Sequence, residues 1–68
     1  MKIKLNNRDE IIEKKDKISF EELINYKNYS FHMLVTKLND KLVKKENRKT
    51  TFIKDGDNVI VMHLISGG

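Results

Sequence analysis

The sequence has 68 residues, the length of one small domain, and contains no cysteine, which excludes disulfides and thiolate metal sites. A domain of this size buries only about 60% of its unfolded-chain surface, so its core has to be compact. Charged residues make up 35% and hydrophobic residues 38%, a balance typical of a globular domain rather than of a disordered tail. No apolar run approaches the ~20 residues that a bilayer crossing needs, and no signal-peptide pattern follows Met1. We therefore expect a cytoplasmic protein with no membrane partner.

The formal net charge is +4, from 14 basic and 10 acidic side chains. A basic chain can bind nucleic acid, or it can simply carry a solvated lysine-rich surface. The lysines are spread along the sequence, with the densest pairs at Lys14-Lys15 and Lys44-Lys45, and no aromatic platform is interleaved with them. We expect no nucleic-acid partner and keep a basic nucleic-acid-binding module only as a remote alternative.

The first part of the chain predicts a hairpin. Apolar and charged residues alternate from Met1 to Asn6, which is typical of a half-buried strand with Ile3 and Leu5 facing the core. Asn6-Asn7 predicts a turn, since asparagine tolerates positive φ. Residues 10–14 predict the second strand.

A helix follows the hairpin. Ser19-Phe20-Glu21-Glu22 predicts a capping box, in which Ser19 and Glu22 each bind the backbone amide of the other. Phe20, Leu23 and Ile24 form one apolar stripe, and the helix is predicted to end between Tyr26 and Asn28. The aromatic side chains at its exit are expected to pack there: Tyr26, Tyr29 and Phe31.

The second half predicts mainly strands. The expected elements are a strand over residues 33–38, a turn at Asn39-Asp40, a strand over 41–43, a loop or single helical turn over 44–50, a turn at Asp55-Gly56 and a last strand over 58–65. A lone helix with one apolar stripe must cover one face of a sheet. The first and last strands have the strongest apolar content, so we expect them side by side and parallel in the middle. The predicted fold class is α+β, a ubiquitin-like β-grasp with a mixed sheet of four to five strands and one main helix on one face.

The end of the chain is the candidate functional site. The last strand runs without a linker into Ser66-Gly67-Gly68, so we divide the chain into a β-grasp domain at 1–65 and a flexible tail at 66–68. At ~3.3 Å per residue, Ile65 to Gly68 would reach roughly 13 Å, enough to enter another protein's active site. The terminal carboxyl has a pKa near ~3.5 and is ionised at neutral pH. The hypothesis is that this carboxylate is the reactive group.

The chain offers no catalytic machinery of its own. It has no glycine-rich phosphate loop, no Ser-His-Asp set and no metal-ligand cluster. We therefore expect it not to be an enzyme and to bind no cofactor or metal.

A candidate docking face follows from strand parity. If Val59 and Val61 face the helix, then Ile60, Met62 and Leu64 point to the opposite side of the sheet, and Val35 on the neighbouring strand joins them. An apolar cluster with no helix above it is a candidate partner surface. A dimer seam and simple β-propensity are the alternatives.

Three segments together resemble a known family. They are Leu38-Asn39-Asp40-Lys41-Leu42-Val43, then Ile53-Lys54-Asp55-Gly56-Asp57-Asn58-Val59-Ile60-Val61, and the terminal Gly67-Gly68. This pattern resembles the ThiS family, the ubiquitin-related sulfur carrier proteins of thiamine (thiazole) biosynthesis, from Leu34 to Gly68. The chain departs from the usual pattern at Asp40, where glycine is common, at Lys44, where proline is common, and at Phe52, where proline or a small residue is frequent. We expect these positions to lie in loops, where they would affect turn geometry more than function.

The resemblance implies a specific route. The Gly68 carboxylate would be adenylated by an E1-like adenylyltransferase that uses ATP, and then converted to a thiocarboxylate with a persulfide derived from a cysteine desulfurase. Thiazole synthase would accept the sulfur, and the carrier would be monomeric when free. Without Cβ atoms, Gly67 and Gly68 could thread a narrow channel. The alternatives are the small subunit of molybdopterin synthase, another ubiquitin-like sulfur carrier, or a modifier conjugated to lysines.

Overall fold

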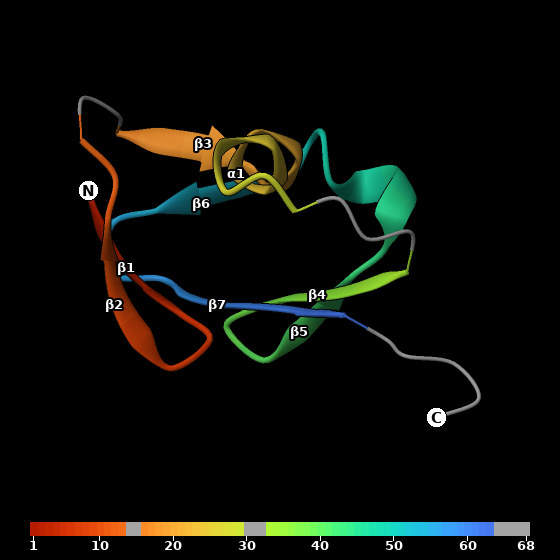
Figure 1. The fold of residues 1–68 in the computed structure, drawn as a ribbon. Coiled ribbons are helices and arrows are strands. Elements are labelled where there is room, and N and C mark those ends of the chain that lie inside the picture. The colour runs from red at the N-terminus through yellow and green to blue at the C-terminus, as the bar shows by residue number, and fades with distance from the viewer. Residues whose placement is uncertain (14–15, 30–32, 64–68) are drawn as a thin grey trace.

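The computed structural model describes residues 1–13, 16–29 and 33–63. In chain order the elements are β1 (Lys2–Leu5), β2 (Arg8–Ile11), β3 (Lys17–Ser19), α1 (Phe20–Tyr26), β4 (Leu34–Leu38), β5 (Lys41–Val43), the 3-10 helix η1 (Lys45–Asn47), β6 (Phe52–Lys54) and β7 (Asn58–His63). Five strands form one sheet in the order β2-β1-β7-β4-β5, and β3 pairs with β6. Helix α1 and the β3-β6 pair lie above one face of the five-stranded sheet (Figure 1). The predicted α+β architecture is confirmed.

Strand β7 is the central strand of the sheet. It runs parallel to β1, with Leu5 opposite Val59, and antiparallel to β4, with Val35 opposite Met62. This confirms that the first and last strands are parallel neighbours in the middle of the sheet. The prediction that β7 begins at Asn58 is correct, and its predicted end at Ile65 lies outside the described residues.

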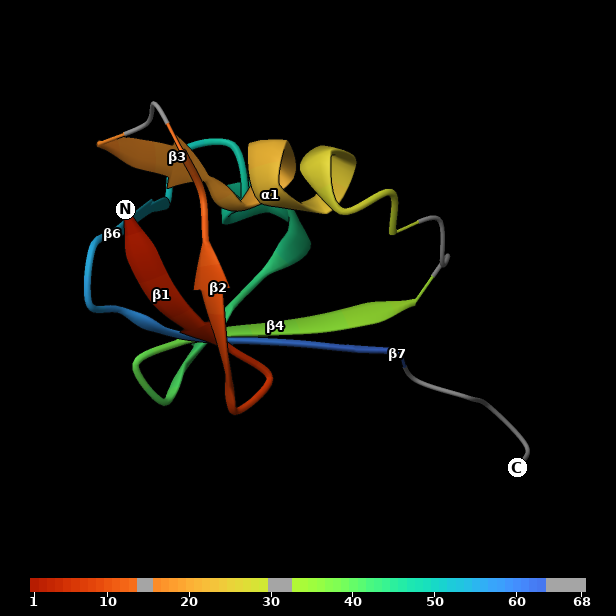
Figure 2. The same cartoon turned by 60° about the vertical axis from the view of Figure 1, so that its left-hand side comes forward.

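Figure 2 shows α1 above the sheet, and the buried core side chains come from the helix and from the strands below it. Phe20 and Leu23 of α1 are fully buried, and so is Val59 of β7. The other buried members of this core come from every layer: Ile3, Leu5, Ile12, Ile18, Val43, Ile53 and Val61. The apolar stripe and the inward residues of β1 are therefore placed as predicted.

Local hydrogen bonds set both ends of α1. Ser19 Oγ accepts from the Glu22 amide at 3.1 Å, while the Glu22 carboxylate accepts from the Ser19 amide at 3.0 Å, so the predicted capping box is present. At the other end Asn28 has φ 57 and the Tyr29 amide donates to the Ile24 carbonyl at 3.0 Å. This is a Schellman ending with asparagine in the left-handed position. Neither α1 nor η1, the helices of the described residues, has the length and apolar character of a membrane crossing.

The predicted turns are all present. Asn6 and Asn7 have φ values of 53 and 68, and Asn39 and Asp40 have 50 and 70. Two consecutive residues with positive φ are what a two-residue hairpin turn requires, because this geometry matches the twist of the strands. Gly56 has φ 86 and turns the chain from β6 toward β7.

Two parts of the predicted secondary structure are wrong: the bounds of the second strand, and the omission of two short strands. The second strand begins at Arg8 rather than Glu10, because the two-residue turn lets pairing start directly with Leu5 opposite Arg8. It ends at Ile11, before the predicted end at residue 14. Strands β3 and β6 were not predicted at all. Each has three residues and one buried apolar side chain, Ile18 or Ile53, which is too little for periodicity to detect.

The packing of the helix-exit aromatic residues is only partly as predicted. Tyr29 packs against the core. Tyr26 is 56% exposed, so its predicted packing is wrong. Phe31 lies outside the described residues.

Candidate functional site

The candidate site has two parts, the end of β7 and the face of the sheet opposite α1. The predicted tail residues Ile65, Ser66, Gly67 and Gly68 lie outside the described residues, and so does Leu64 of the predicted docking face. What the structure describes is the base from which this segment leaves, up to His63.

Asn6 holds β7 beyond the end of β1. Its side-chain oxygen accepts from the Val61 amide at 2.9 Å, and its side-chain nitrogen donates to the Val61 carbonyl at 3.1 Å. The backbone amide of Asn6 also donates to Val59 at 2.9 Å. The side chain thus takes the place of a strand residue where β1 turns away. The sequence marked Asn6 as a turn residue only, and no local pattern indicates this second role.

Asn39 and Asp57 fix the start of β7 from the other side. The Asn39 side-chain oxygen accepts from the Asn58 amide at 2.9 Å, and its side-chain nitrogen donates to Asp57 at 3.1 Å. The second Asp57 carboxylate oxygen accepts from the Lys54 amide at 2.9 Å. The Asp-Gly-Asp and Asn-Asp motifs therefore form one hydrogen-bonded unit at the base of the strand.

A buried arginine ties β4, the other neighbour of β7, to η1. Arg48 Nη2 donates to the Leu34 carbonyl at 2.8 Å, and Nε donates to Thr36 Oγ1 at 3.2 Å. Thr36 in turn donates to Val43 at 2.6 Å. Because Leu34 lies opposite His63, this network supports the sheet at the point where β7 ends. Arg48 was not singled out in the sequence, because an exposed position is the usual expectation for arginine.

The side chains of β7 alternate between the two faces of the sheet as the sequence predicts. Val59 and Val61 are buried toward α1, while Met62 is 49% exposed on the opposite face. Ile60 and Val35 are half-buried, and the register places Val35 directly opposite Met62.

The structure adds Leu42 to this face. Leu42 is 62% exposed and lies opposite Lys37, which lies opposite Ile60. It was missed because a three-residue strand gives no parity signal of its own. We call Val35, Ile60, Met62 and Leu42 the outer-face patch. The structure brings the described members of the predicted docking face together, and their role as a docking surface stays a prediction.

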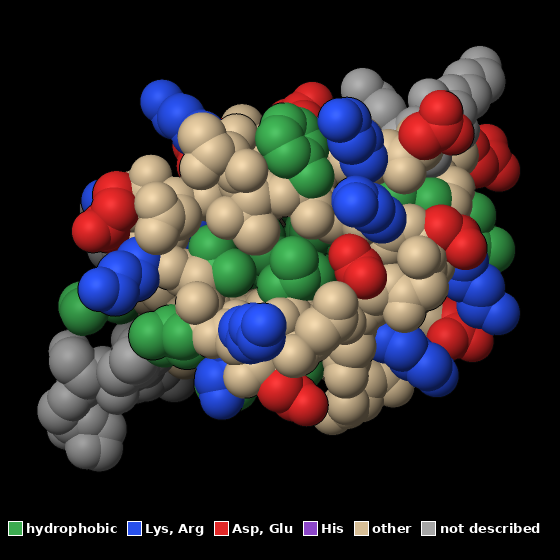
Figure 3. All heavy atoms as spheres, turned by 180° about the vertical axis from the view of Figure 1, so that it is seen from behind, with side chains coloured by type: hydrophobic (Ala, Val, Ile, Leu, Met, Phe, Trp, Pro, Cys, Tyr) green, Lys and Arg blue, Asp and Glu red, His purple; other side chains and the backbone are tan. Residues whose placement is uncertain are grey.

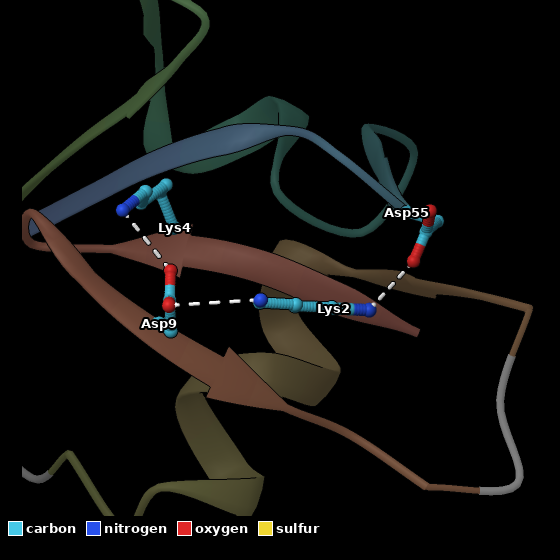
Figure 4. Close-up of polar contacts among 4 residues, drawn as sticks. All are labelled: Lys2, Lys4, Asp9 and Asp55. Carbon is cyan, nitrogen blue, oxygen red and sulfur yellow. Dashed lines mark hydrogen bonds and ion pairs between the residues drawn. The ribbon is translucent and has the colours of Figure 1, made fainter.

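The charged part of the same face lies toward β1 and β2. Lys4 and Lys2 contact the Asp9 carboxylate at 3.0 and 3.7 Å, and the Lys2 amide donates to Asp55 at 2.7 Å (Figure 4). The hydrogen bond from Lys4, with the charges of Lys2 and Lys4, lowers the pKa of Asp9 below its ordinary value of 3.8. On another side of the molecule, seen from behind in Figure 3, basic and acidic side chains are interspersed rather than gathered into a continuous basic stripe.

No metal or catalytic centre emerges from the part of the chain that the structure describes. Among residues 1–13, 16–29 and 33–63, no three His, Asp or Glu side chains gather as a metal site. A hollow of about 410 Å³ lies beside α1, and its lining is mainly apolar or acidic: Ile12, Glu13, Ile18, Glu22, Asn25 and Tyr26. This lining has no hydroxyl or thiol nucleophile paired with a histidine base.

The fold has the features of the ubiquitin-like β-grasp class. The sheet is mixed with its last strand in the centre, one helix lies on one face, and the sequence continues from this strand to Gly-Gly. The sequence model of the ThiS family matches residues 2–68. The chain belongs to the ThiS family.

Solved structures agree in fold. The crystal structure of the thiamine biosynthesis protein ThiS from Geobacter metallireducens is similar with a TM-score of 0.91, 22% sequence identity and 100% of both chains covered. An NMR solution structure of a thiamine biosynthesis protein from the same organism has a TM-score of 0.81 at 22% identity, covering 100% of this chain and 88% of the other. At this identity the likeness shows the fold, and it confirms the β-grasp prediction. No curated protein matches the chain significantly.

Proposed function

We propose that this chain is a sulfur carrier protein of thiamine thiazole biosynthesis, and that its Gly68 carboxylate carries the sulfur as a thiocarboxylate. Membership of the ThiS family supports a sulfur carrier role and an interaction with partner enzymes of thiamine biosynthesis. The observation that carries the proposal is the placement of β7, the central strand, from whose last residue, His63, the sequence continues to Gly67-Gly68.

The last part of β7 is held from both neighbouring strands. Asn6, after β1, binds β7 at Val61. On the other side Leu34 of β4, whose carbonyl accepts from Arg48, lies opposite His63. We infer that residues 1–65 form the β-grasp domain and residues 66–68 the arm that reaches the partner. At ~3.3 Å per residue, the extended segment from Ile65 to Gly68 would span roughly 13 Å. If β7 is held in place, the Gly68 carboxylate lies within a defined distance of the domain.

The proposed chemistry has three steps. A carboxylate oxygen of Gly68 attacks the α-phosphorus of ATP, so that a C–O–P link forms, the bond between the α- and β-phosphates breaks, and pyrophosphate leaves. The outer sulfur of a persulfide then attacks the acyl carbon, a C–S bond forms, and the C–O bond to AMP breaks, which leaves an acyl disulfide. A thiol of the partner attacks this disulfide, the S–S bond breaks, and the thiocarboxylate leaves as a disulfide forms on the partner. A side chain at position 68 would crowd the carbon under attack, which favours glycine there.

The chain acts here as a co-substrate rather than as an enzyme. An E1-like adenylyltransferase would hold ATP, a cysteine desulfurase would supply the sulfur, and thiazole synthase would receive it. We propose that this reaction takes place in the cytoplasm. Ile60, Met62 and Val35, with Leu64, would dock on the partner while the tail enters its active site, and the free carrier would be monomeric.

One pair of variants tests the proposal. Adding one alanine after Gly68 moves the carboxylate away from its glycine and should abolish ATP-dependent pyrophosphate release by the host's adenylating enzyme. Ser66→Ala is the matched control, because it changes the tail but leaves the carboxylate on Gly68, and it should retain near wild-type release. Both variants should unfold at the wild-type urea concentration. Unchanged pyrophosphate release from the extended variant would show that Gly68 is not the activated group.

A further inference from the structure

We propose that Lys37 determines partner specificity on the outer face, and that the enzyme covering this face presents a carboxylate to it. This inference rests on the proposed function, since the partner is the adenylating enzyme that would receive the tail. It goes beyond that function by naming the charge that the partner must supply and the place where it must lie.

Lys37 lies in the middle of the outer-face patch. On one side it is opposite Ile60 of β7, and on the other it is opposite Leu42 of β5. Val35 precedes it by two residues on the same face of β4, and Met62 lies opposite Val35. Directly opposite side chains on a sheet have Cβ atoms about 4.5–5.5 Å apart. Lys37 is itself half-buried, as expected when the aliphatic part of a lysine lies along apolar neighbours and its ammonium reaches the surface.

The lysines at the other end of this face differ from Lys37 in their electrostatic environment. Lys2 and Lys4 share the Asp9 carboxylate at 3.7 and 3.0 Å, so each of these ammonium groups has an acidic group of the protein beside it (Figure 4). Within residues 1–13, 16–29 and 33–63, no carboxylate lies within ion-pair distance of the Lys37 amine. Among the described residues, the outer-face patch therefore surrounds a lysine, Lys37, that has no carboxylate of the protein beside its ammonium group.

This combination restricts what can cover the patch. A surface that buries the four apolar side chains also removes water from Lys37, and burying an ammonium without a counter-charge is strongly unfavourable. The covering surface must therefore be apolar with a carboxylate opposite Lys37. A second copy of this chain, packed symmetrically patch to patch, would bring another Lys37 toward the first and add repulsion. A nucleic-acid backbone would require several neighbouring cations rather than one lysine ringed by apolar side chains.

The test titrates carrier variants against the host's adenylating enzyme and measures pyrophosphate release. Lys37→Glu should raise the KM for the carrier about tenfold or more, with kcat little changed, because like charges then face each other across the interface. Lys37→Met should raise KM less, since it leaves the partner's carboxylate unpaired but adds no repulsion. Lys54→Glu on β6 is the matched control, and its KM should stay within about twofold of wild type. Urea unfolding confirms that each variant is folded.

Several outcomes would overturn the proposal. Equal KM values for Lys37→Glu and Lys54→Glu would remove Lys37 from the interface, and a lower KM for Lys37→Met would show that no carboxylate faces it. Sedimentation of the carrier alone as a dimer that Lys37→Glu dissociates would assign the patch to a second copy. Calorimetry of carrier binding to the enzyme, without ATP, tests the docking proposal separately from the proposed function. Wild-type binding that Lys37→Glu weakens, without any pyrophosphate release, would contradict the proposed function and leave the docking proposal standing.

Discussion

At the scale of single residues, asparagine and aspartate carry the turn geometry of this protein. Asp40 has φ 70, the left-handed conformation that glycine adopts most easily. The departure from the family pattern at this position therefore keeps the turn, because aspartate tolerates this region better than most side chains. Asn28 has the same role at the end of α1, with φ 57.

Asp9 provides a prediction for pH. Its pKa is lowered by the hydrogen bond from Lys4 and by the charges of Lys2 and Lys4. A carboxyl whose folded-state pKa lies below its unfolded value contributes stability above the unfolded pKa and loses it as pH falls through the folded value. The free energy of unfolding of the wild type should therefore fall more steeply below about pH 4 than that of Asp9→Asn.

Urea titrations from pH 7 to acid measure this difference. Because Asp9 and its lysine partners are exposed, the difference in acid sensitivity between the two proteins should be small. It should shrink further in 1 M salt, where the Debye length is only about 3 Å. If the free energies of unfolding of the wild type and Asp9→Asn fell equally with pH at low salt, this account would be contradicted.

At the scale of elements, β7 is held by side chains as well as by its neighbouring strands. The hydrogen bonds of Asn6 to Val61 continue the β1-β7 ladder past the end of β1. This matters for function because the tail leaves from the end of this strand. A carrier whose last strand frayed would present its carboxylate at a variable distance.

Asn6→Gly and Asn7→Gly form a matched pair. Both residues have positive φ, so glycine fits the backbone in each case, and both variants gain similar unfolded-state entropy. Only Asn6 makes the two side-chain bonds to β7. Asn6→Gly should therefore lower the free energy of unfolding by about 1–3 kcal/mol more than Asn7→Gly, at about 0.5–1.5 kcal/mol per bond.

Urea denaturation gives both values, and amide exchange of Val61 reports the strand directly. Exchange at Val61 should become faster in Asn6→Gly and stay near wild type in Asn7→Gly. Equal stabilities of the two variants would show that the Asn6 side chain does not hold β7.

Much of the fold could be predicted from sequence because its signals are local. The Asn6-Asn7 turn, the capping box at Ser19 and the apolar stripe of α1 each depend on a few adjacent residues, and each is confirmed. Strands β3 and β6 could not be predicted, since one buried isoleucine in three residues has no periodicity. Their pairing is a tertiary contact between segments far apart in the chain.

The candidate site divides in the same way. Alternation along β7 and β4 was enough to place Val35, Ile60 and Met62 on one face. Leu42 and the central position of Lys37 depend on the register between β4 and β5, which no single segment encodes. The bonds from Asn6 to Val61 and from Arg48 to Leu34 likewise join residues that only the folded chain brings together.

At the scale of the whole molecule, the core between α1 and the sheet fixes β7, and the sequence continues from β7 to Gly68. Under the proposed function, Gly68 carries the reactive carboxylate and the outer face docks on a partner. The same design could serve a protein modifier, since an activated carboxylate reacts with amines as well as with sulfur. The product formed at Gly68 separates these functions.

The most direct measurement is the intact mass of the protein after incubation with the host's adenylating enzyme, ATP and a sulfur source, followed by fragmentation. The account predicts an ATP-dependent exchange of one oxygen for one sulfur, located at Gly68 by the C-terminal fragment ions. A ladder of larger conjugates would indicate a modifier instead. An unchanged mass under conditions in which the enzyme activates its own established carrier would contradict the central claim.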